Sequence, residues 1–239
     1  MISSTSLLLA VLTPASCGAL VGGPQHPGSP ALRAVETDAV ENHAVAAHAV
    51  GVRGMVPETL EELYRSGLPF AEFLAQADRR KEMWNDHYEG GEVAETLLAQ
   101  ASAIEGTWRI LAVAEDWCSD SVNTIPYLAR LTEQVDGIEM RIIDSEVGRE
   151  IMESHRTPDG RPATPTVLIL NEAFEEAGCW VERPSKLQTW ALENRPKLED
   201  QEFVSQKMAW YREDSGERTV SEVLELIEAA ASGHPICGA

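Results

Sequence analysis

Short apolar segments alternate with helical patterns along most of the chain. Apolar residues at a spacing of three or four predict helices, and four short apolar segments are typical of strands. The predicted helical stretches are 57–88, 93–104, 121–135, 148–155, 185–195, 199–212 and 218–231, and the predicted strands are 108–114, 138–144, 166–170 and 174–181. This order predicts an α/β fold: a central mixed sheet of about four strands, with helices on both faces and extra N- and C-terminal helices.

The two ends of the chain lack this pattern. Gly, Pro, Ala and His dominate residues 1–54, which predicts a disordered tail, and residues 232–239 are expected to form a flexible C-terminal tail. The folded domain is therefore expected over 55–231, with an N-terminal helical extension. Because Met55 directly precedes helical sequence, translation that starts there is an alternative.

A weak signal-like feature lies near the start of the chain. An apolar run at 7–12 precedes Cys17, a possible lipid-attachment site, but no Lys or Arg precedes that run, whereas secretory signals usually start positive. Pro14 also lies where a lipid-attachment motif normally has a branched apolar residue. The run is also too short to span a membrane, so no integral membrane span is expected. The sequence favours a cytoplasmic protein, and export or lipid anchoring through Cys17 is the alternative.

The charge of the chain narrows its possible partners. It has 39 Asp and Glu against 19 Lys and Arg, a formal net charge of −20. Such a chain repels phosphate backbones, so nucleic-acid partners are not expected. Hydrophobic residues make up 44% of the sequence, which is enough for a folded core. An acidic protein adapted to high salt and an ordinary acidic protein both fit these numbers.

The candidate chemistry lies in the segment Trp117-Cys118-Ser119-Asp120-Ser121. Cys118 leaves a predicted buried strand and opens a helix, where free backbone N–H groups favour the thiolate, the nucleophile of disulfide exchange. A structural cysteine packed as a small apolar residue is the alternative. Glu115, Asp116 and Asp120 would oppose the thiolate by raising the thiol pKa, and we expect them to form a solvated acidic rim.

This segment resembles the active site of the thioredoxin-like superfamily, W-C-x-x-C at the end of the first core strand. Here the motif reads Trp117-Cys118-x-x-Ser121. Pro126 lies five residues after Ser121, where the family has a helix-kinking proline. Thr164-Pro165-Thr166 opens a predicted strand, where the family has a cis-proline that faces the active cysteine. The resemblance covers about residues 93–195 and implies a thioredoxin-like fold.

The resemblance also implies a role for each matching residue. Cys118 takes the position of the nucleophile, and Ser121 takes that of the resolving cysteine. Pro165 takes the cis-proline position beside an extended substrate chain. Thr164 would face Cys118, and Trp117 would flank the site.

The serine at position 121 decides which mechanisms stay open. Ser121 cannot resolve a mixed disulfide, so the resemblance implies a monothiol thiol-disulfide oxidoreductase that acts in cell redox homeostasis. A small thiol such as glutathione would resolve the intermediate, or Cys237 would do so from its tail; Cys179 is expected in the core. The alternative is a non-catalytic thioredoxin-fold binding module, since Ala112 also replaces the buried acid of the family.

The remaining expectations concern ligands. Arg183 follows the last predicted strand at the same sheet edge as Cys118, where it could bind an anionic substrate group, offset the acidic residues or form a structural salt bridge. Residue spacing shows no metal-ligand cluster near Cys118, and no metal or cofactor is expected. The expected partners are protein or small-molecule thiols and disulfides.

Overall fold

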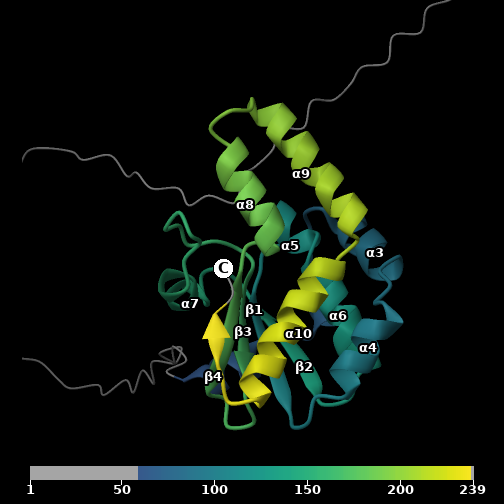
Figure 1. Cartoon of the computed structure of the whole chain (residues 1–239), viewed down its shortest axis with the longest axis vertical. Helices are drawn as coiled ribbons and strands as arrows, with labels where there is room; N and C mark the ends of the chain where they lie inside the picture. The colour runs from purple at the N-terminus through teal and green to yellow at the C-terminus, as the bar shows by residue number, and fades with distance from the viewer. Residues whose placement is uncertain (1–58, 238–239) are drawn as a thin grey trace, which may run out of the picture.

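The computed structural model describes residues 59–237, which form a mixed sheet with helices on both faces (Figure 1). The strands are β1 (Trp108–Val113), β2 (Ile138–Ile143), β3 (Thr166–Leu170), β4 (Glu176–Val181) and β5 (Ile236–Cys237), in the spatial order β2-β1-β3-β4-β5. β1 pairs with β2 in parallel, β3 is antiparallel to β1 and β4, and β5 is parallel to β4. The predicted α/β class is confirmed. The predictions for residues 1–54, including Cys17, and for Met55 lie outside the described residues.

The helices form an N-terminal group, a central group and a C-terminal group. They are α1 (Leu60–Ser66), α2 (Phe70–Gln76), α3 (Lys81–Glu89), α4 (Glu95–Ser102), α5 (Ser119–Val122), α6 (Ile125–Gln134), α7 (Arg149–Ser154), α8 (Ser185–Asn194), α9 (Asp200–Asp214) and α10 (Glu217–Ala231). The extra helices predicted at both ends are present. Among the described residues, no helix has the length and apolar character needed to cross a bilayer.

Alternate residues of the central strands enter two separate cores, as the two-residue period of a strand requires. On one face, Ile110 and Ile169 pack with apolar residues of α3, α4, α6 and α10. On the other face, Leu111 and Leu168 pack with residues of α1 and α7. The near-continuous apolar sequence of β1 and β3 follows from this burial on both faces.

The single kinked helix predicted over 121–135 is two helices. α5 ends at Val122, and α6 begins at Ile125, so Pro126 lies in the first turn of α6. A proline needs no N–H partner in the first turn, and its fixed φ suits that position. Pro126 therefore follows the interruption and does not bend a continuous helix.

The C-terminal segment also differs from its prediction. Residues 232–239 were expected as a flexible tail, but Ile236 pairs with Gly178 and Cys237 pairs with Cys179 at the edge of the sheet. A strand of two residues is too short to show a period in the sequence, and a disulfide between Cys179 and Cys237 ties it to β4. The sheet consequently has five strands where about four were predicted.

α8 and α9 extend beyond the end of the sheet near α5 (Figure 1). The rings of Trp190 and Phe203 stack with centroids 5.3 Å apart, which joins α8 to α9. α9 thus lies beside the helix that follows Cys118, and its side chains can reach that segment.

Candidate functional site

Cys118 lies where β1 has ended and α5 begins. It is the N-cap residue of α5, and its Sγ accepts a hydrogen bond from the backbone N–H of Ser121, with N and Sγ 3.4 Å apart. The carbonyl oxygen of Thr164 lies 3.2 Å from the same sulfur, and the Thr164–Pro165 peptide bond is cis. The structure therefore brings together Cys118, Ser121, Thr164 and Pro165, which the sequence placed in one site from two distant segments.

Ser121 and Trp117 contribute through their backbone in ways the sequence does not reveal. The Ser121 hydroxyl is buried and has no hydrogen-bond partner among the described residues; the contact with Cys118 comes from its amide. Trp117 is half-buried beside the site, and its carbonyl accepts a hydrogen bond from Arg80 Nε at 2.8 Å. The motif is thus anchored to the N-cap residue of α3 through this contact with Arg80.

The expected acidic rim takes a different form. Glu115 accepts a hydrogen bond from the Ser145 amide at 2.8 Å, and Asp116 accepts from the amides of Asp78 and Arg79, each at 2.8 Å. These two carboxylates tie the turn before Cys118 to neighbouring loops. Asp120 is only 1% exposed, so the prediction that it is solvated is wrong.

Asp120 is the centre of a buried ionic cluster. Its carboxylate accepts hydrogen bonds from Lys207 Nζ at 2.9 and 3.0 Å, from Tyr211 Oη at 2.9 Å and from an Arg183 nitrogen at 3.2 Å. Burial alone would raise the pKa of Asp120, but the charges of Arg183 and Lys207 and the hydrogen bonds from Lys207 and Tyr211 hold it well below its usual range. Asp120 is therefore ionised and neutralised at pH 7.

Arg183 is part of this cluster and contacts two carboxylates, those of Asp120 and Glu182. Burial would lower the pKa of its guanidinium, but Asp120 and Glu182 raise it. Of the roles that the sequence left open for Arg183, the structure shows the structural salt bridge. Its side chain is 8% exposed, so an anionic substrate group would have to displace one of its carboxylates.

The ionic cluster connects the two segments of the motif. Asp120 lies within the Cys118 segment, and the backbone N–H of Glu182 donates to the carbonyl of Pro165 at 2.7 Å. Glu182 also contacts Arg161 at 3.1 Å. Sequence reasoning missed Glu182, Lys207 and Tyr211. The only signal was that Lys207 is one of four lysines in the chain.

A cavity of about 420 Å³ opens beside the turn that leads to Cys118. Its lining includes Glu115 and Asp116 from that turn, Phe73 from α2, and Ile142 and Val147 near the end of β2. The walls are mainly apolar, with the carboxylates of Glu115, Asp116 and Asp144 among them. This cavity suits an uncharged or cationic group rather than an anion.

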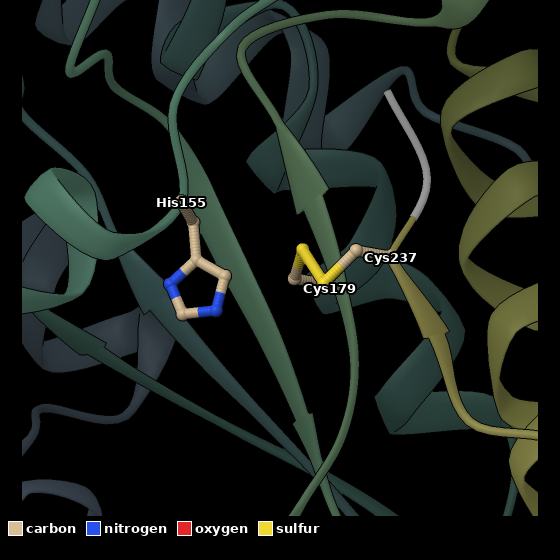
Figure 2. Close-up of side chains that lie close together, drawn as sticks. All are labelled: His155, Cys179 and Cys237. Carbon is tan, nitrogen blue, oxygen red and sulfur yellow. A yellow bond between two sulfur atoms is a disulfide. The ribbon is translucent and has the colours of Figure 1, made fainter.

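Cys237, proposed from the sequence as a possible resolving thiol, lies elsewhere in the structure. It forms a disulfide with Cys179, whose Cα is 4.4 Å away on the neighbouring strand (Figure 2). Cys179 is buried, as predicted, but it is bonded rather than a free core residue. The structure thus brings Cys237 to Cys179 and does not bring it to Cys118 in this form of the protein.

The sheet order, the helices on both faces and the cis-proline beside the N-cap cysteine define a thioredoxin-like fold. The family described as Thioredoxin matches residues 67–202, more than half of the chain. The chain therefore belongs to the thioredoxin family, over a wider span than the motifs alone indicated. No curated protein is similar enough in sequence to count as a match.

Two solved structures share the fold over most of their length. A Pseudomonas aeruginosa protein of unknown function is 24% identical, with a TM-score of 0.58 over 72% of this chain and 98% of that one. An HIV epitope scaffold is 23% identical, with a TM-score of 0.57 and the same coverage. At these identities, both structures support the fold and nothing finer.

Proposed function

We propose that this protein is a thiol-disulfide oxidoreductase that acts through Cys118 alone, by a monothiol mechanism. The observation that carries the proposal is the pairing of Cys118 Sγ with the Ser121 amide, beside the Thr164 carbonyl, while a serine occupies the resolving position. The family supports thiol or disulfide substrates in general. The monothiol step is the part that requires a test.

The electrostatics around Cys118 support a thiolate. Cys118 is disulfide-bonded in this structure; once that bond is reduced, the Ser121 N–H, which points at the sulfur, would stabilise negative charge on it. Asp120, two residues away, would repel a thiolate if it stood alone, but Lys207 and Arg183 neutralise it. Of the three carboxylates that the sequence set against Cys118, Asp120 is thus paired with two cations, whereas Glu115 and Asp116 accept hydrogen bonds from neutral groups.

The reaction proceeds by two thiol-disulfide exchanges. Before these exchanges, an external dithiol reduces the disulfide that Cys118 forms in this structure and itself becomes a disulfide, which frees the Cys118 sulfur. The Cys118 thiolate then attacks one sulfur of a substrate disulfide, so a bond forms between Cys118 and that sulfur while the other substrate sulfur leaves as a thiolate and takes a proton from water. A small external thiol, as its thiolate, then attacks the substrate sulfur, and Cys118 leaves as the thiolate. The external thiol ends in a disulfide with the substrate, which a second thiol molecule can reduce.

The first prediction is a mixed disulfide on Cys118. The protein is reduced, desalted and incubated at pH 7 with glutathione disulfide, and intact-mass and peptide spectra are recorded. We expect one glutathione on Cys118, and the Cys118→Ser variant should lose that adduct. A parallel variant with Ser at positions 17, 179 and 237 should keep it. Absence of any Cys118 adduct would overturn the proposal and favour the non-catalytic binding module.

The second prediction concerns Ser121→Cys. Because the Ser121 amide is 3.4 Å from Cys118 Sγ and its hydroxyl has no partner among the described residues, a thiol there should attack the mixed disulfide. The Cys118 adduct should then decay at least about 10-fold faster, leaving a disulfide between Cys118 and the introduced thiol. Quenched mass spectrometry measures the decay, with Ser121→Ala as the matched control. Equal decay in both variants would show that position 121 cannot resolve the adduct.

A further inference from the structure

The Cys179–Cys237 disulfide lies beside a histidine on the edge of the sheet. The two sulfurs and a ring nitrogen of His155 lie within 4.8 Å of one another (Figure 2). His155 is the C-cap residue of α7, Cys179 is on β4 and Cys237 is on β5, so three separate elements converge here. Residue spacing gave no sign of this group, because its members are far apart in the sequence.

We infer that, when this disulfide is reduced, Cys179, Cys237 and His155 form a binding site for a thiophilic divalent cation of the Zn²⁺ class. The inference is independent of the function proposed for Cys118. Thiolate sulfur and imidazole nitrogen are the donors that Zn²⁺ prefers in proteins. The disulfide and the metal site are alternative states of the same residues.

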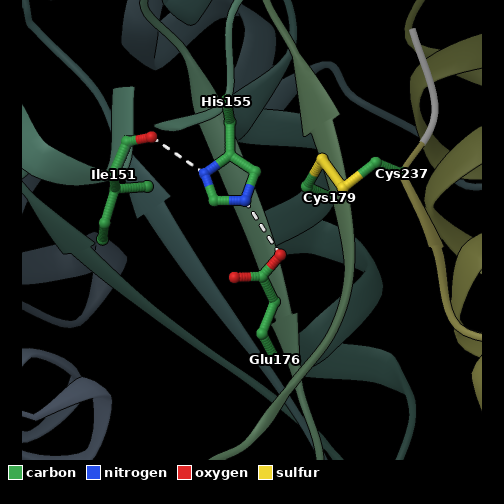
Figure 3. Close-up of a disulfide and its surroundings, with 5 residues drawn as sticks. All are labelled: Ile151, His155, Glu176, Cys179 and Cys237. Carbon is green, nitrogen blue, oxygen red and sulfur yellow. Dashed lines mark hydrogen bonds and ion pairs between the residues drawn. A yellow bond between two sulfur atoms is a disulfide. The ribbon is translucent and has the colours of Figure 1, made fainter. Parts of the chain in front are cut away.

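The hydrogen bonds of His155 leave the appropriate nitrogen for a metal. Nδ1 lies 2.8 Å from the backbone carbonyl of Ile151, and a carbonyl only accepts, so Nδ1 carries the proton (Figure 3). This arrangement fixes the ring and leaves Nε2 as the nitrogen whose lone pair can bind a cation, as in many zinc sites. The ring is thus oriented as a ligand before any metal binds.

Glu176 supplies an oxygen next to the His155 ring. Its Oε1 lies 2.8 Å from His155 Nε2 (Figure 3), a contact that needs a proton between the two atoms. A cation can take the place of that proton and bind both atoms. Glu176 is not part of the group of three whose ligand atoms lie within 4.8 Å of one another, so its side chain would have to shift toward the sulfurs to act as the fourth ligand. A site with two sulfurs, one nitrogen and one oxygen fits tetrahedral Zn²⁺.

The distances between the two sulfurs and the His155 nitrogen are close to those of a zinc site. Ligand atoms at about 2.0–2.3 Å from a tetrahedral Zn²⁺ lie roughly 3.3–3.8 Å from one another. Reduction lets the two sulfurs separate from bonding distance toward that value, and the nitrogen already lies within 4.8 Å of both. Cys237 is exposed, so a reductant and a metal ion can both reach the group.

The redox step is a two-electron exchange with a dithiol. The reductant becomes a disulfide, the Cys179–Cys237 bond breaks, and the two protons of the reductant end on the two cysteine sulfurs. Metal binding then releases these two protons and any proton on His155 Nε2. Reoxidation by a disulfide compound reverses the exchange and expels the metal.

The test is a cobalt titration of the full chain carrying Cys17→Ser and Cys118→Ser, so that only the Cys179–Cys237 pair can supply thiolates. The protein is reduced with a dithiol, the dithiol is removed under anaerobic conditions, and the protein is then titrated with Co²⁺. We expect one equivalent of Co²⁺, with near-ultraviolet thiolate-to-cobalt absorption and the visible bands of a tetrahedral site. One equivalent of Zn²⁺ should abolish these bands, and the oxidised chain should show none.

Two variants separate a metal site from an isolated thiol pair. His155→Ala should weaken Co²⁺ binding at least about 10-fold, and Cys237→Ser should weaken it by about 100-fold or more. His87→Ala is the matched control, because the His87 ring also bonds a backbone carbonyl but lies on α3. The inference is overturned if the reduced chain shows no thiolate–cobalt absorption, or if His155→Ala binds Co²⁺ as tightly as its parent.

Discussion

Replacing Asp120 by Asn is expected to lower the free energy of unfolding by about 3–5 kcal/mol at pH 7. The Asp120 carboxylate contacts Lys207 and Arg183, whose side chains are 7% and 8% exposed. The substitution keeps the shape of the side chain but leaves two buried cations without that countercharge, and Arg183 retains only Glu182. Urea or guanidinium denaturation followed by circular dichroism measures the loss.

Two further variants show whether burial is the cause. Asp159→Asn also removes a carboxylate from an arginine, but the Asp159 and Arg161 side chains are 35% and 38% exposed, so a loss below about 1 kcal/mol is expected. Adding Lys207→Met to Asp120→Asn removes one uncompensated cation and should restore part of the stability. If Asp120→Asn and Asp159→Asn have equal effects, the ionic cluster does not stabilise the fold as described.

The same cluster gives the stability a defined pH dependence. The pKa of Asp120 is lower in the folded state than its unfolded value of about 3.9. Its contribution is therefore fully present above about pH 5 and is lost as the pH falls toward the folded pKa. The stability difference between the parent and Asp120→Asn should stay constant from pH 7 to 5 and shrink below about pH 4.

The sequence predicted the parts of the fold that depend on local patterns. β1 and β3 are continuous apolar segments because they are buried on both faces, and the Cys118 and Pro165 segments follow from their motifs. β5 was not predicted from the sequence. Its two residues are held in place by pairing with β4 and by the Cys179–Cys237 disulfide, and no local sequence pattern encodes either interaction.

The ionic cluster escaped prediction for a related reason. Asp120 is 63 residues from Arg183, 87 from Lys207 and 91 from Tyr211, so only the fold brings them together. An acidic residue next to a cysteine in an acidic chain resembles any surface carboxylate. Its burial depends on α9, a helix that continues beyond the span matched by the family.

The position of α9 depends in turn on Gly216, and Gly216→Ala is expected to destabilise the protein by about 3 kcal/mol or more. Gly216 is the N-cap residue of α10, two residues after the end of α9, with a φ of +81°. An alanine Cβ there would lie 2.1 Å from Cγ of the buried Tyr127 ring. The left-handed conformation costs an L-residue about 1–2 kcal/mol, and overpacking of the core adds about 1–3 kcal/mol.

Gly160→Ala is the matched control for this substitution. Gly160 has the same φ of +81°, but an added Cβ meets nothing within 4 Å, so only the backbone cost of about 1–2 kcal/mol is expected. The difference between the two variants in chemical denaturation therefore measures the clash with Tyr127. Equal losses would mean that the α9–α10 junction can move away from Tyr127. In that case, α9 would not hold Lys207 and Tyr211 rigidly against Asp120.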